Sequence, residues 1–302
     1  MIFMKPNFWQ TKNFISLLLF PLTLITFSIN FLKKFNIKNH FKIKTICIGN
    51  LSAGGTGKTS LAVELNELLR DKFKTVFIKK KYSNQKDEYN LLKKRGKIIL
   101  SENRINALQN AEKNFDLAIL DDGLQQKNIE YDLKIVCINS YEGFGNNFLL
   151  PAGPLRENSN ELKNYDIVFL NGFKKNQKLK NKIKKINNNL KIFDAIYEPT
   201  NLKKYNLKNK FLFFCGIGNP HEFENTLKKF KFKIKEKFIF PDHHNMSDET
   251  INNMKDIANK NNFNIITTEK DFLRLTKKQQ QGINFLKVKL KIKNLSKLKK
   301  FL

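Results

Sequence analysis

Short apolar runs alternate with amphipathic segments along most of the chain. Six runs have the length and composition of strands: Ile43–Ile48, Lys74–Ile78, Lys97–Leu100, Phe115–Leu120, Leu133–Ile138 and Asp166–Leu170. Between the first two, the segment Lys58–Arg70 repeats aliphatic residues with the period of a helix. Strands that are separated by helices indicate an α/β fold, with a mostly parallel sheet covered by helices on both faces.

The same alternation continues in the second part of the chain, after a stretch at Lys174–Asn189 that is rich in Lys and Asn. That stretch predicts a solvated helix. After it, we predict strands at Phe211–Cys215, Ile234–Phe240, Phe263–Thr267 and near Phe285–Leu290. We predict helices at Pro220–Phe230 and Ser247–Asn261. With a boundary near Tyr205, we expect three parts: residues 1–34, a larger α/β domain at 35–205 and a smaller one at 206–302.

The N-terminal part has a different pattern, because Asn13–Leu32 contains no charge over 20 residues. Lys12 precedes this run and two lysines, Lys33 and Lys34, follow it. Twenty helical residues are about as long as the hydrocarbon core of a bilayer is thick, although Pro21 is expected to kink the helix. The run therefore predicts a membrane-associating helix that spans the bilayer or lies in its interface. A hydrophobic helix packed on the domain is the alternative.

Composition changes this picture little. The net charge of +29 comes from lysines spread over nearly every segment, and no nucleic-acid recognition module accompanies them. We therefore expect a preference for anionic membranes and phosphorylated substrates, and no nucleic acid as the main partner. Cys47, Cys137 and Cys215 each lie in an apolar run without metal-ligand spacing, which predicts buried, reduced thiols.

The clearest chemical motif is a glycine-rich loop between the first strand and the first helix. It is formed by the residues Ser52, Ala53, Gly54, Gly55, Thr56, Gly57, Lys58 and Thr59. Such a loop binds nucleotide phosphates through backbone amides and the helix N-terminus, with the lysine at the β- and γ-phosphates and the threonine on Mg²⁺. The common pattern has Gly where this chain has Ser52, but the position between strand and helix predicts an ATP site.

Two carboxylates follow another buried strand. Asp121 and Asp122 come directly after FDLAIL, and Gly123 follows them. A carboxylate at the end of a strand beside the phosphate loop is the usual partner of Mg²⁺ in this architecture, whereas alone the motif is more typical of a turn. We expect Asp121 or Asp122 to hold the metal, directly or through water.

A pair of histidines, His243 and His244, follows a strand of the second domain in the motif Pro241–His244. Adjacent histidines do not chelate a metal from one helix face, and the other histidines, His40 and His221, are distant in sequence. A zinc site, a histidine without a role and a histidine that orients a catalytic carboxylate remain open from the residues alone.

Together these motifs resemble the tetraacyldisaccharide 4'-kinase family. The resemblance is carried, in chain order, by IGNLSAGGTGKT at 48–59, LDDGLQQ at 120–126, GFGNNFLLPAGPLRE at 143–157, CGIGNPHEF at 215–223, FPDHH at 240–244 and TTEKDFLRL at 267–275. It implies an ATP- and Mg²⁺-dependent kinase that phosphorylates the 4'-hydroxyl of an acylated disaccharide phosphate lipid. It also implies a monomer whose N-terminal helix holds it on the cytoplasmic face of the bacterial inner membrane.

The resemblance also assigns roles that spacing alone does not give. Asp87 matches the family's catalytic base, with His243 as its helper, and Glu157 matches a further carboxylate near the metal. The surroundings of Asp87 depart from the family's Gly-Asp-Glu-Pro element, because Lys86 replaces the glycine and Tyr89 the proline. The KKKY segment at 79–82 and Gln126 are further departures, from an Arg-Gly-Tyr element and from a histidine.

Two other functions are compatible with a phosphate loop. One is a membrane-associated ATPase of the partitioning or targeting type, although Ala53 occupies the position of its signature lysine. The other is a basic scaffold with a relic loop, which the intact Lys58 and Thr59 argue against.

Overall fold

The computed structural model describes residues 5–82, 86–242 and 244–302, and it leaves the side chains of Lys86 and Asp87 undescribed. The contacts divide this chain into two compact units. Of the described residues, the larger unit contains 5–82, 92–196 and 292–302, and the smaller unit 86–91, 197–242 and 244–291. The break thus comes at 196/197, not near Tyr205. Residues 86–91, expected in the larger domain, belong to the smaller unit, and residues 292–302, expected in the smaller domain, belong to the larger unit.

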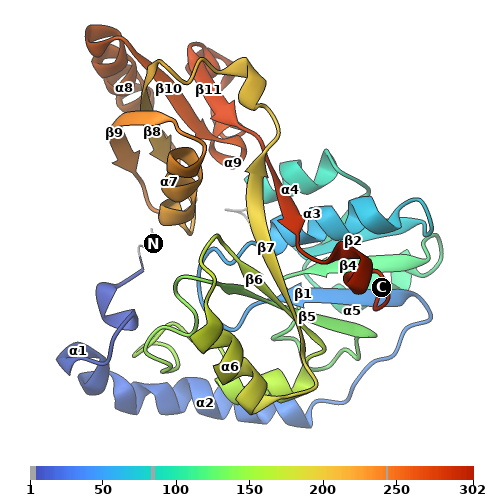
Figure 1. The fold of residues 1–302 in the computed structure, drawn as a ribbon. Coiled ribbons are helices and arrows are strands. Elements are labelled where there is room, and N and C mark those ends of the chain that lie inside the picture. The colour runs from blue at the N-terminus through green and yellow to red at the C-terminus, as the bar shows by residue number, and fades with distance from the viewer. Residues whose placement is uncertain (1–4, 83–85, 243) are drawn as a thin grey trace. The chain divides into compact units, whose positions relative to one another are not determined.

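An eight-stranded sheet forms the centre of the larger unit, in the order β12-β7-β6-β5-β1-β4-β2-β3 (Figure 1). Its strands are β1 (Lys44–Gly49), β2 (Thr75–Lys80), β3 (Ile98–Ser101), β4 (Leu117–Asp121), β5 (Leu133–Asn139), β6 (Ile167–Asn171), β7 (Lys191–Pro199) and β12 (Val288–Ile292). The pairs from β7 to β3 are all parallel, as the alternation of strands and helices predicted. The strand β12 explains why the C-terminal residues return to the larger unit, since it pairs beside β7 at the edge of this sheet.

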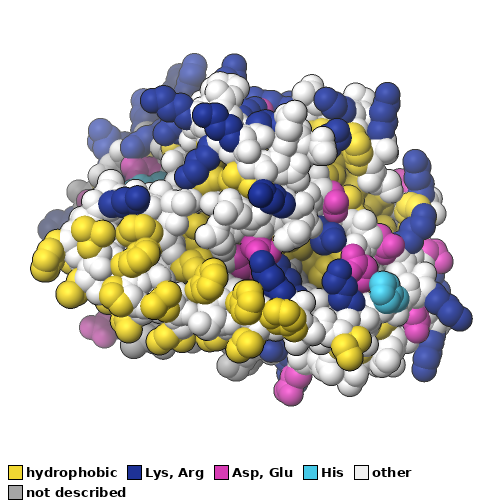
Figure 2. All heavy atoms as spheres, turned by 90° about the horizontal axis from the view of Figure 1, so that it is seen from below, with side chains coloured by type: hydrophobic (Ala, Val, Ile, Leu, Met, Phe, Trp, Pro, Cys, Tyr) yellow, Lys and Arg dark blue, Asp and Glu magenta, His cyan; other side chains and the backbone are white. Residues whose placement is uncertain are grey.

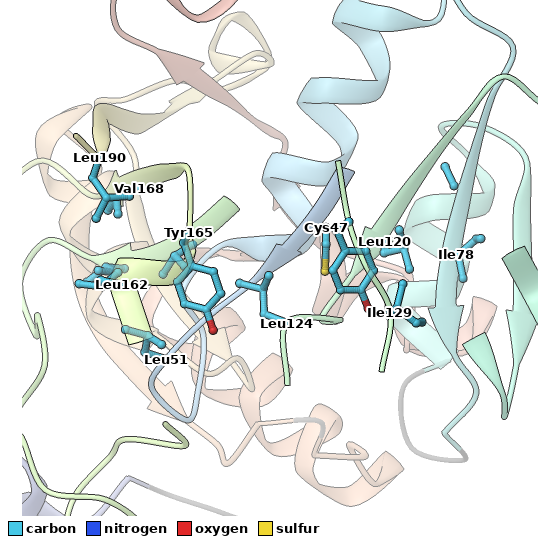
Figure 3. Packing of buried hydrophobic residues seen from close by; sticks show 14 of the residues in the cluster. Cys47, Leu51, Ile78, Leu120, Leu124, Ile129, Leu162, Tyr165, Val168 and Leu190 are labelled. Carbon is cyan, nitrogen blue, oxygen red and sulfur yellow. The ribbon is translucent and has the colours of Figure 1, made fainter. Parts of the chain in front are cut away.

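Helices cover both faces of the sheet. On one face lies α3 (Lys58–Leu69), which buries its aliphatic stripe against β1, β4 and β2. The opposite face is covered by α5 (Arg104–Ala111), the 3₁₀ helix η4 (Ser159–Asn164) and α6 (Gln177–Ile186). Side chains from these elements pack with those of the strands into one buried cluster, part of which is drawn in Figure 3.

Three of the sequence expectations need correction. The strand β7 was not predicted, because KIFDAIYEP mixes apolar and charged residues, as its place next to the edge strand β12 allows. The helix α6 is not fully solvated, since Leu179 and Ile183 are buried against the sheet while its lysines face water. The last strand of the sequence prediction is two strands, β11 (Ile283–Leu286) and β12, separated by Lys287.

The smaller unit has its own four-stranded parallel sheet in the order β11-β10-β8-β9. The other three strands are β8 (Lys210–Cys215), β9 (Lys233–Ile239) and β10 (Phe263–Thr268). Alternate residues of β8 pack on α7 (Pro220–Lys229) on one face and on α8 (Asp248–Asn261) on the other. Shorter helices complete the unit: η5 (Leu202–Lys204), α9 (Glu269–Phe272) and α10 (Lys277–Gln280).

The residues from Asn7 to Phe35, which include the apolar N-terminal run, form short helices of the larger unit. They are η1 (Asn7–Trp9), α1 (Phe14–Leu18), η2 (Phe20–Leu22), α2 (Thr23–Leu32) and η3 (Lys33–Phe35). Asn13 caps α1, and Pro21 lies in the 3₁₀ helix η2, which interrupts the α-helix between α1 and α2. Trp9 anchors the start of the run, because it is buried and its Nε1 donates to the Pro151 carbonyl at 3.0 Å.

Most apolar side chains of these helices face outward. Between Phe14 and Ile37, fourteen large apolar side chains are exposed, and Figure 2 shows them as a continuous band. None of the helices that the described residues form has both the length and the apolar composition needed to cross a bilayer.

The three cysteines are buried and free, as predicted. Burial raises the pKa of the Cys47 thiol to about 12, so the group stays protonated and unreactive. The helices α4 (Lys86–Lys93) and α11 (Leu295–Leu298) complete the elements.

Candidate active site

The phosphate loop joins β1 to α3, as its sequence predicted. Gly54 and Gly57 have φ angles of 102° and 85°, which a residue with a Cβ rarely adopts. The amide of Asn50 donates to the carbonyls of Ser52 and Gly54, at 2.6 and 3.3 Å. The amide of Asn171, at the end of β6, donates to the carbonyl of Thr56 at 2.5 Å. The protein's own side chains therefore hold the shape of the loop.

A second segment, Pro154–Arg156, supports the loop from its other side. Ala53 N–H donates to the Pro154 carbonyl at 2.8 Å, and Arg156 N–H donates to the Leu51 carbonyl at 2.6 Å. Ser52 and Leu155 form an antiparallel bridge between these two bonds. The first half of the loop is thus one strand of a short ladder.

The predicted lysine and threonine lie beside the predicted carboxylates. Thr59 Oγ1 donates to Asp121 Oδ2 at 2.9 Å, and Lys58 Nζ lies 3.6 Å from Asp122 Oδ1. The sheet explains this meeting, because Ile48 at the end of β1 is in register with Asp121 at the end of β4. Carboxyl ends of parallel strands are where such folds place their ligands.

Two cations that the motifs did not indicate complete this cluster. Lys79 on β2 is in register with Asp121 and its Nζ lies 2.6 Å from Asp121 Oδ2, with both side chains buried. Arg156 Nη1 lies 3.2 Å from each carboxylate oxygen of Asp122. In the sequence, Lys79 stands near the end of an apolar strand. A lysine at such a position is equally typical of a solvated strand end, so the sequence did not indicate its role in the site.

Asp122 has a strained backbone and a perturbed carboxylate. Its φ of 64° is left-handed, which is uncommon for a residue other than glycine. Burial by itself raises the pKa of Asp122, but the charges of Lys58, Arg156 and Lys79 outweigh it and hold the pKa below its usual value. Asp122 is therefore charged at neutral pH and neutralises the cations that surround it.

The environment of Asp121 fits a magnesium ion. Its Oδ1 is buried and has no hydrogen-bond partner, while its Oδ2 lies against the Thr59 hydroxyl. Oxygen donors of this kind suit Mg²⁺, which takes few protein ligands and completes its shell with phosphates and water. Within the described residues, no three His, Cys, Asp or Glu side chains form a cage for a metal.

Glu157, the remaining predicted metal ligand, has other partners. Its carboxylate is buried, accepts a hydrogen bond from Tyr165 Oη at 2.7 Å and lies 2.8 Å from Lys127 Nζ. These contacts explain how the carboxylate of Glu157 is accommodated in the fold, and its role as a metal ligand stays a prediction.

Gln126, where the family usually has His, has a partner that sequence reasoning missed. Arg104 on α5 is buried, and its Nη1 donates to Gln126 Oε1 at 3.1 Å. Its Nη2 donates to the Asp122 carbonyl at 2.7 Å. Gln126 therefore helps to hold Arg104 against the backbone of the strained Asp122.

The predicted base and its helper lie outside the described residues: His243 entirely, and Asp87 by its side chain, although its backbone lies in the first turn of α4. Their neighbours in sequence are described, in the smaller unit. Lys270 Nζ lies 3.1 Å from Glu88 Oε1 and 3.5 Å from Asp242 Oδ1. The segments that carry Asp87 and His243, more than 150 residues apart in sequence, are thus joined by one lysine.

The blocks CGIGNPHEF and TTEKDFLRL meet in the same unit. The buried carboxylate of Asp271 accepts hydrogen bonds from Gly216 N–H at 3.1 Å and from Thr268 Oγ1 at 2.6 Å. Arg274 Nη1 donates to both Asp271 and the Gly216 carbonyl, each at 2.9 Å. This network holds the loop after β8 against α9, next to Lys270.

Comparisons with known proteins agree with this geometry. The model of the tetraacyldisaccharide-1-P 4'-kinase family matches residues 15–302. A tetraacyldisaccharide 4'-kinase of Pelagibacter ubique (strain HTCC1062) is 44% identical over 293 residues, which cover 95% of this chain and 93% of that protein. The chain belongs to the tetraacyldisaccharide 4'-kinase family. The family and the kinase class predicted from the sequence are confirmed, in preference to an ATPase of the partitioning type or a scaffold.

Two further relatives support the assignment. A tetraacyldisaccharide 4'-kinase of Rickettsia akari (strain Hartford) is 36% identical over 310 residues, covering 96% of this chain and 93% of that protein. Among solved structures, the "apo" form of LpxK from Aquifex aeolicus in complex with ATP has a TM-score of 0.72 and 25% identity. That match covers 95% of this chain and 98% of the Aquifex chain.

Proposed function

We propose that this kinase transfers the γ-phosphoryl group of ATP to the 4'-hydroxyl of a tetraacyldisaccharide 1-phosphate, a step in making lipid A. The observation that carries the proposal is the meeting of Lys58, Thr59, Asp121 and Asp122 at the strand ends of a chain in the 4'-kinase family. Phosphoryl transfer needs positioning and charge neutralisation more than covalent chemistry, and this cluster supplies both.

The residues of the phosphate loop have distinct tasks. The backbone at Gly54–Thr59, together with the N-terminus of α3, binds the phosphates. Lys58 exchanges its contact with Asp122 for the β- and γ-phosphates, and Arg156 keeps Asp122 neutralised when Lys58 leaves. Thr59 and Asp121 are the residues that hold Mg²⁺, which supplies charge neutralisation at the phosphates.

We assign the proton transfer to Asp87, oriented by His243. The support is the family resemblance and the contacts of Lys270 to the neighbouring Glu88 and Asp242. Asp87 accepts the proton of the 4'-hydroxyl as its oxygen attacks the γ-phosphorus and the bond from phosphorus to the β,γ-bridging oxygen breaks.

The exposed apolar band supports attachment to a membrane surface. The breaks at η2 and η3 leave helices that are too short to span a bilayer, so we propose that α1 and α2 lie in its interface. Lys12 and Lys38 are exposed at the two ends of the band and attract anionic headgroups. We place the protein on the cytoplasmic face of the inner membrane, where the acyl chains of its substrate can stay in lipid.

The test is transfer of label from γ-labelled ATP to lipid. Purified protein is incubated with a tetraacyldisaccharide 1-phosphate, and the lipid and inorganic phosphate are counted separately. We expect a labelled lipid with wild-type protein and none with Lys58→Ala, while Lys72→Ala, an exposed lysine after α3, keeps activity. Released phosphate without labelled lipid would overturn the kinase in favour of an ATPase.

A further inference from the structure

The helix α2 and the turn after it present a polar stripe toward the larger unit. Thr26, Asn30 and Lys34 are spaced by four residues and therefore lie on one side of the helix. Thr26 Oγ1 donates to the Leu150 carbonyl at 2.7 Å, and Asn30 Nδ2 donates to the Arg156 carbonyl at 2.6 Å. Lys34 Nζ lies 2.6 Å from Glu161 Oε1.

The segment that accepts the hydrogen bonds of Thr26 and Asn30, Leu150–Arg156, includes the residues Pro154–Arg156 that support the phosphate loop. Arg156 makes three different contacts at once. Its carbonyl accepts from Asn30, its N–H donates to the loop at Leu51, and its guanidinium binds Asp122, the partner of Lys58. A movement of α2 against this segment therefore changes both the backbone of the loop and the charge beside Lys58.

The opposite side of α2 is exposed and apolar. Leu24 and Leu32 are 63% and 67% exposed, and the aromatic side chains of Phe27 and Phe31 stack on each other at the surface. A helix of ten residues is marginal in water by itself, so its position depends on what contacts each side. The polar side contacts Leu150–Arg156, and the apolar side fits the interface of a phospholipid bilayer.

We propose that Thr26 and Asn30 are positioning residues that couple binding of the bilayer by α2 to binding of ATP by the phosphate loop. The proposal rests on the membrane attachment proposed above and does not depend on the identity of the phosphate acceptor. Both ligands stabilise the same arrangement of Leu150–Arg156, so each tightens the binding of the other, as linkage requires.

The test measures the affinity of ATP with and without vesicles of phosphatidylglycerol and phosphatidylcholine in equal parts. For wild-type protein we expect the vesicles to lower the Kd of ATP by roughly two- to tenfold, the range of one or two hydrogen bonds. Thr26→Val keeps the shape of the side chain and removes its donor, and Asn30→Ala removes the amide. Each variant is expected to bind ATP more weakly without lipid and to lose most of the vesicle effect, while sedimentation with vesicles persists.

Ser28→Ala is the matched control, because Ser28 is an exposed polar residue on the same helix. It should keep both the affinity of ATP and its response to vesicles. Thermal melts distinguish positioning from loss of structure. A lower Tm in both variants with wild-type Kd values for ATP means that the contacts only stabilise the fold, and this overturns the proposal.

Two results on the wild-type protein also overturn it: vesicles that bind without changing the Kd of ATP, and a protein that does not sediment with vesicles. The second result refutes the membrane attachment as well. Failure of the kinase function itself is seen separately, as an absence of labelled lipid when ATP and vesicles both bind.

Discussion

The ammonium group of Lys79 lies 2.6 Å from Oδ2 of Asp121, and the two side chains are 4% and 0% exposed. The same oxygen accepts the hydrogen bond of Thr59. A lysine of the protein therefore already neutralises the carboxylate that we assign to Mg²⁺. Removing one partner of a buried ion pair leaves an uncompensated charge, which typically costs about 3–5 kcal/mol.

Lys79→Met should therefore lower the free energy of unfolding and make stability depend on Mg²⁺. We expect Mg²⁺ with a non-hydrolysable ATP analogue to raise the Tm of the variant more than that of wild-type protein, because the freed carboxylate gains a cation. Differential scanning fluorimetry over a Mg²⁺ series measures this. Lys81→Met, an exposed lysine just beyond β2, is the control. Equal gains in Tm for variant and wild type would show that Lys79 and the metal do not share Asp121.

Much of the larger unit follows from local pattern. The strands β1 and β4 were predicted within one or two residues at each end, because continuous apolar runs flanked by glycine or aspartate allow little choice. The phosphate loop and the two aspartates were predicted for a related reason, since strand ends in a parallel sheet lie at one edge. An interruption of the apolar N-terminal run at Pro21 was also predicted, but its division into α1, η2 and α2 depends on tertiary contacts such as those of Trp9 and Asn30.

What the sequence could not give was the pairing of residues across long separations. Lys79, Arg104 and Arg156 are three among 56 basic residues. The register of the sheet brings Lys79 to the aspartates, the Pro154–Arg156 ladder brings Arg156, and the place of Arg104 at the start of α5 lets it reach Asp122. The place of β12 in the larger sheet was not predicted for a similar reason, because its alternation of charged and apolar residues resembles that of a solvated edge strand. The roles of Asp87 and Glu157 rested on resemblance and remain predictions.

Glu222 on α7 gives a prediction about pH. Its side chain is buried and neither carboxylate oxygen has a hydrogen-bond partner. Burial raises the pKa of Glu222 to about 7, and the charge of Lys229 offsets this only in part. The folded state then holds the proton more tightly than the unfolded state, so the contribution of Glu222 to stability is most favourable below pH 4.5 and is lost as the pH rises to 7.

Glu222→Gln should remove this dependence. The variant is expected to be more stable than wild type at pH 8, by up to about 3 kcal/mol, and similar to it at pH 4. Urea unfolding at a series of pH values measures the difference, with the exposed Glu249→Gln as control. A difference that stays constant from pH 4 to pH 8 would contradict the prediction.

The exposed face of α2 predicts how strongly the protein binds vesicles. Leu24, Phe27 and Phe31 lie along one stripe and are each at least half exposed. Completing their burial in lipid gains about 1 kcal/mol for each side chain, so replacing all three with Ser should weaken the partitioning into vesicles about a hundredfold. Sedimentation with anionic vesicles measures the partitioning.

The control for that variant is a pair of exposed apolar residues elsewhere in the larger unit, Leu100→Ser with Tyr141→Ser. These changes should leave the partitioning within about twofold of wild type, since single exposed apolar residues contribute little to a specific surface. Similar losses for both variants would mean that general hydrophobicity, and not α2, binds the membrane.

The contacts of Lys270 lead to the sharpest test of the proposed base. Because Lys270 joins the neighbours of Asp87 and His243, we expect those two residues to act as one unit. Asp87→Ala and His243→Ala should each lower kcat by about 10²–10⁴-fold with little change in the KM for ATP. His244→Ala is the control for the histidine, since the ring of His244 stacks on Phe240.

The double variant decides between a coupled pair and two independent groups. If His243 acts by orienting Asp87, the loss of either partner already removes the organised proton transfer, so the double variant should be hardly slower than the slower single variant. If the losses multiply, each residue contributes on its own, and His243 then contacts the substrate or the phosphates directly. An Asp87→Ala variant with normal kcat would show that another carboxylate is the base. Glu88 is the first alternative, because it is the next residue of α4 and Lys270 already holds its carboxylate beside Asp242.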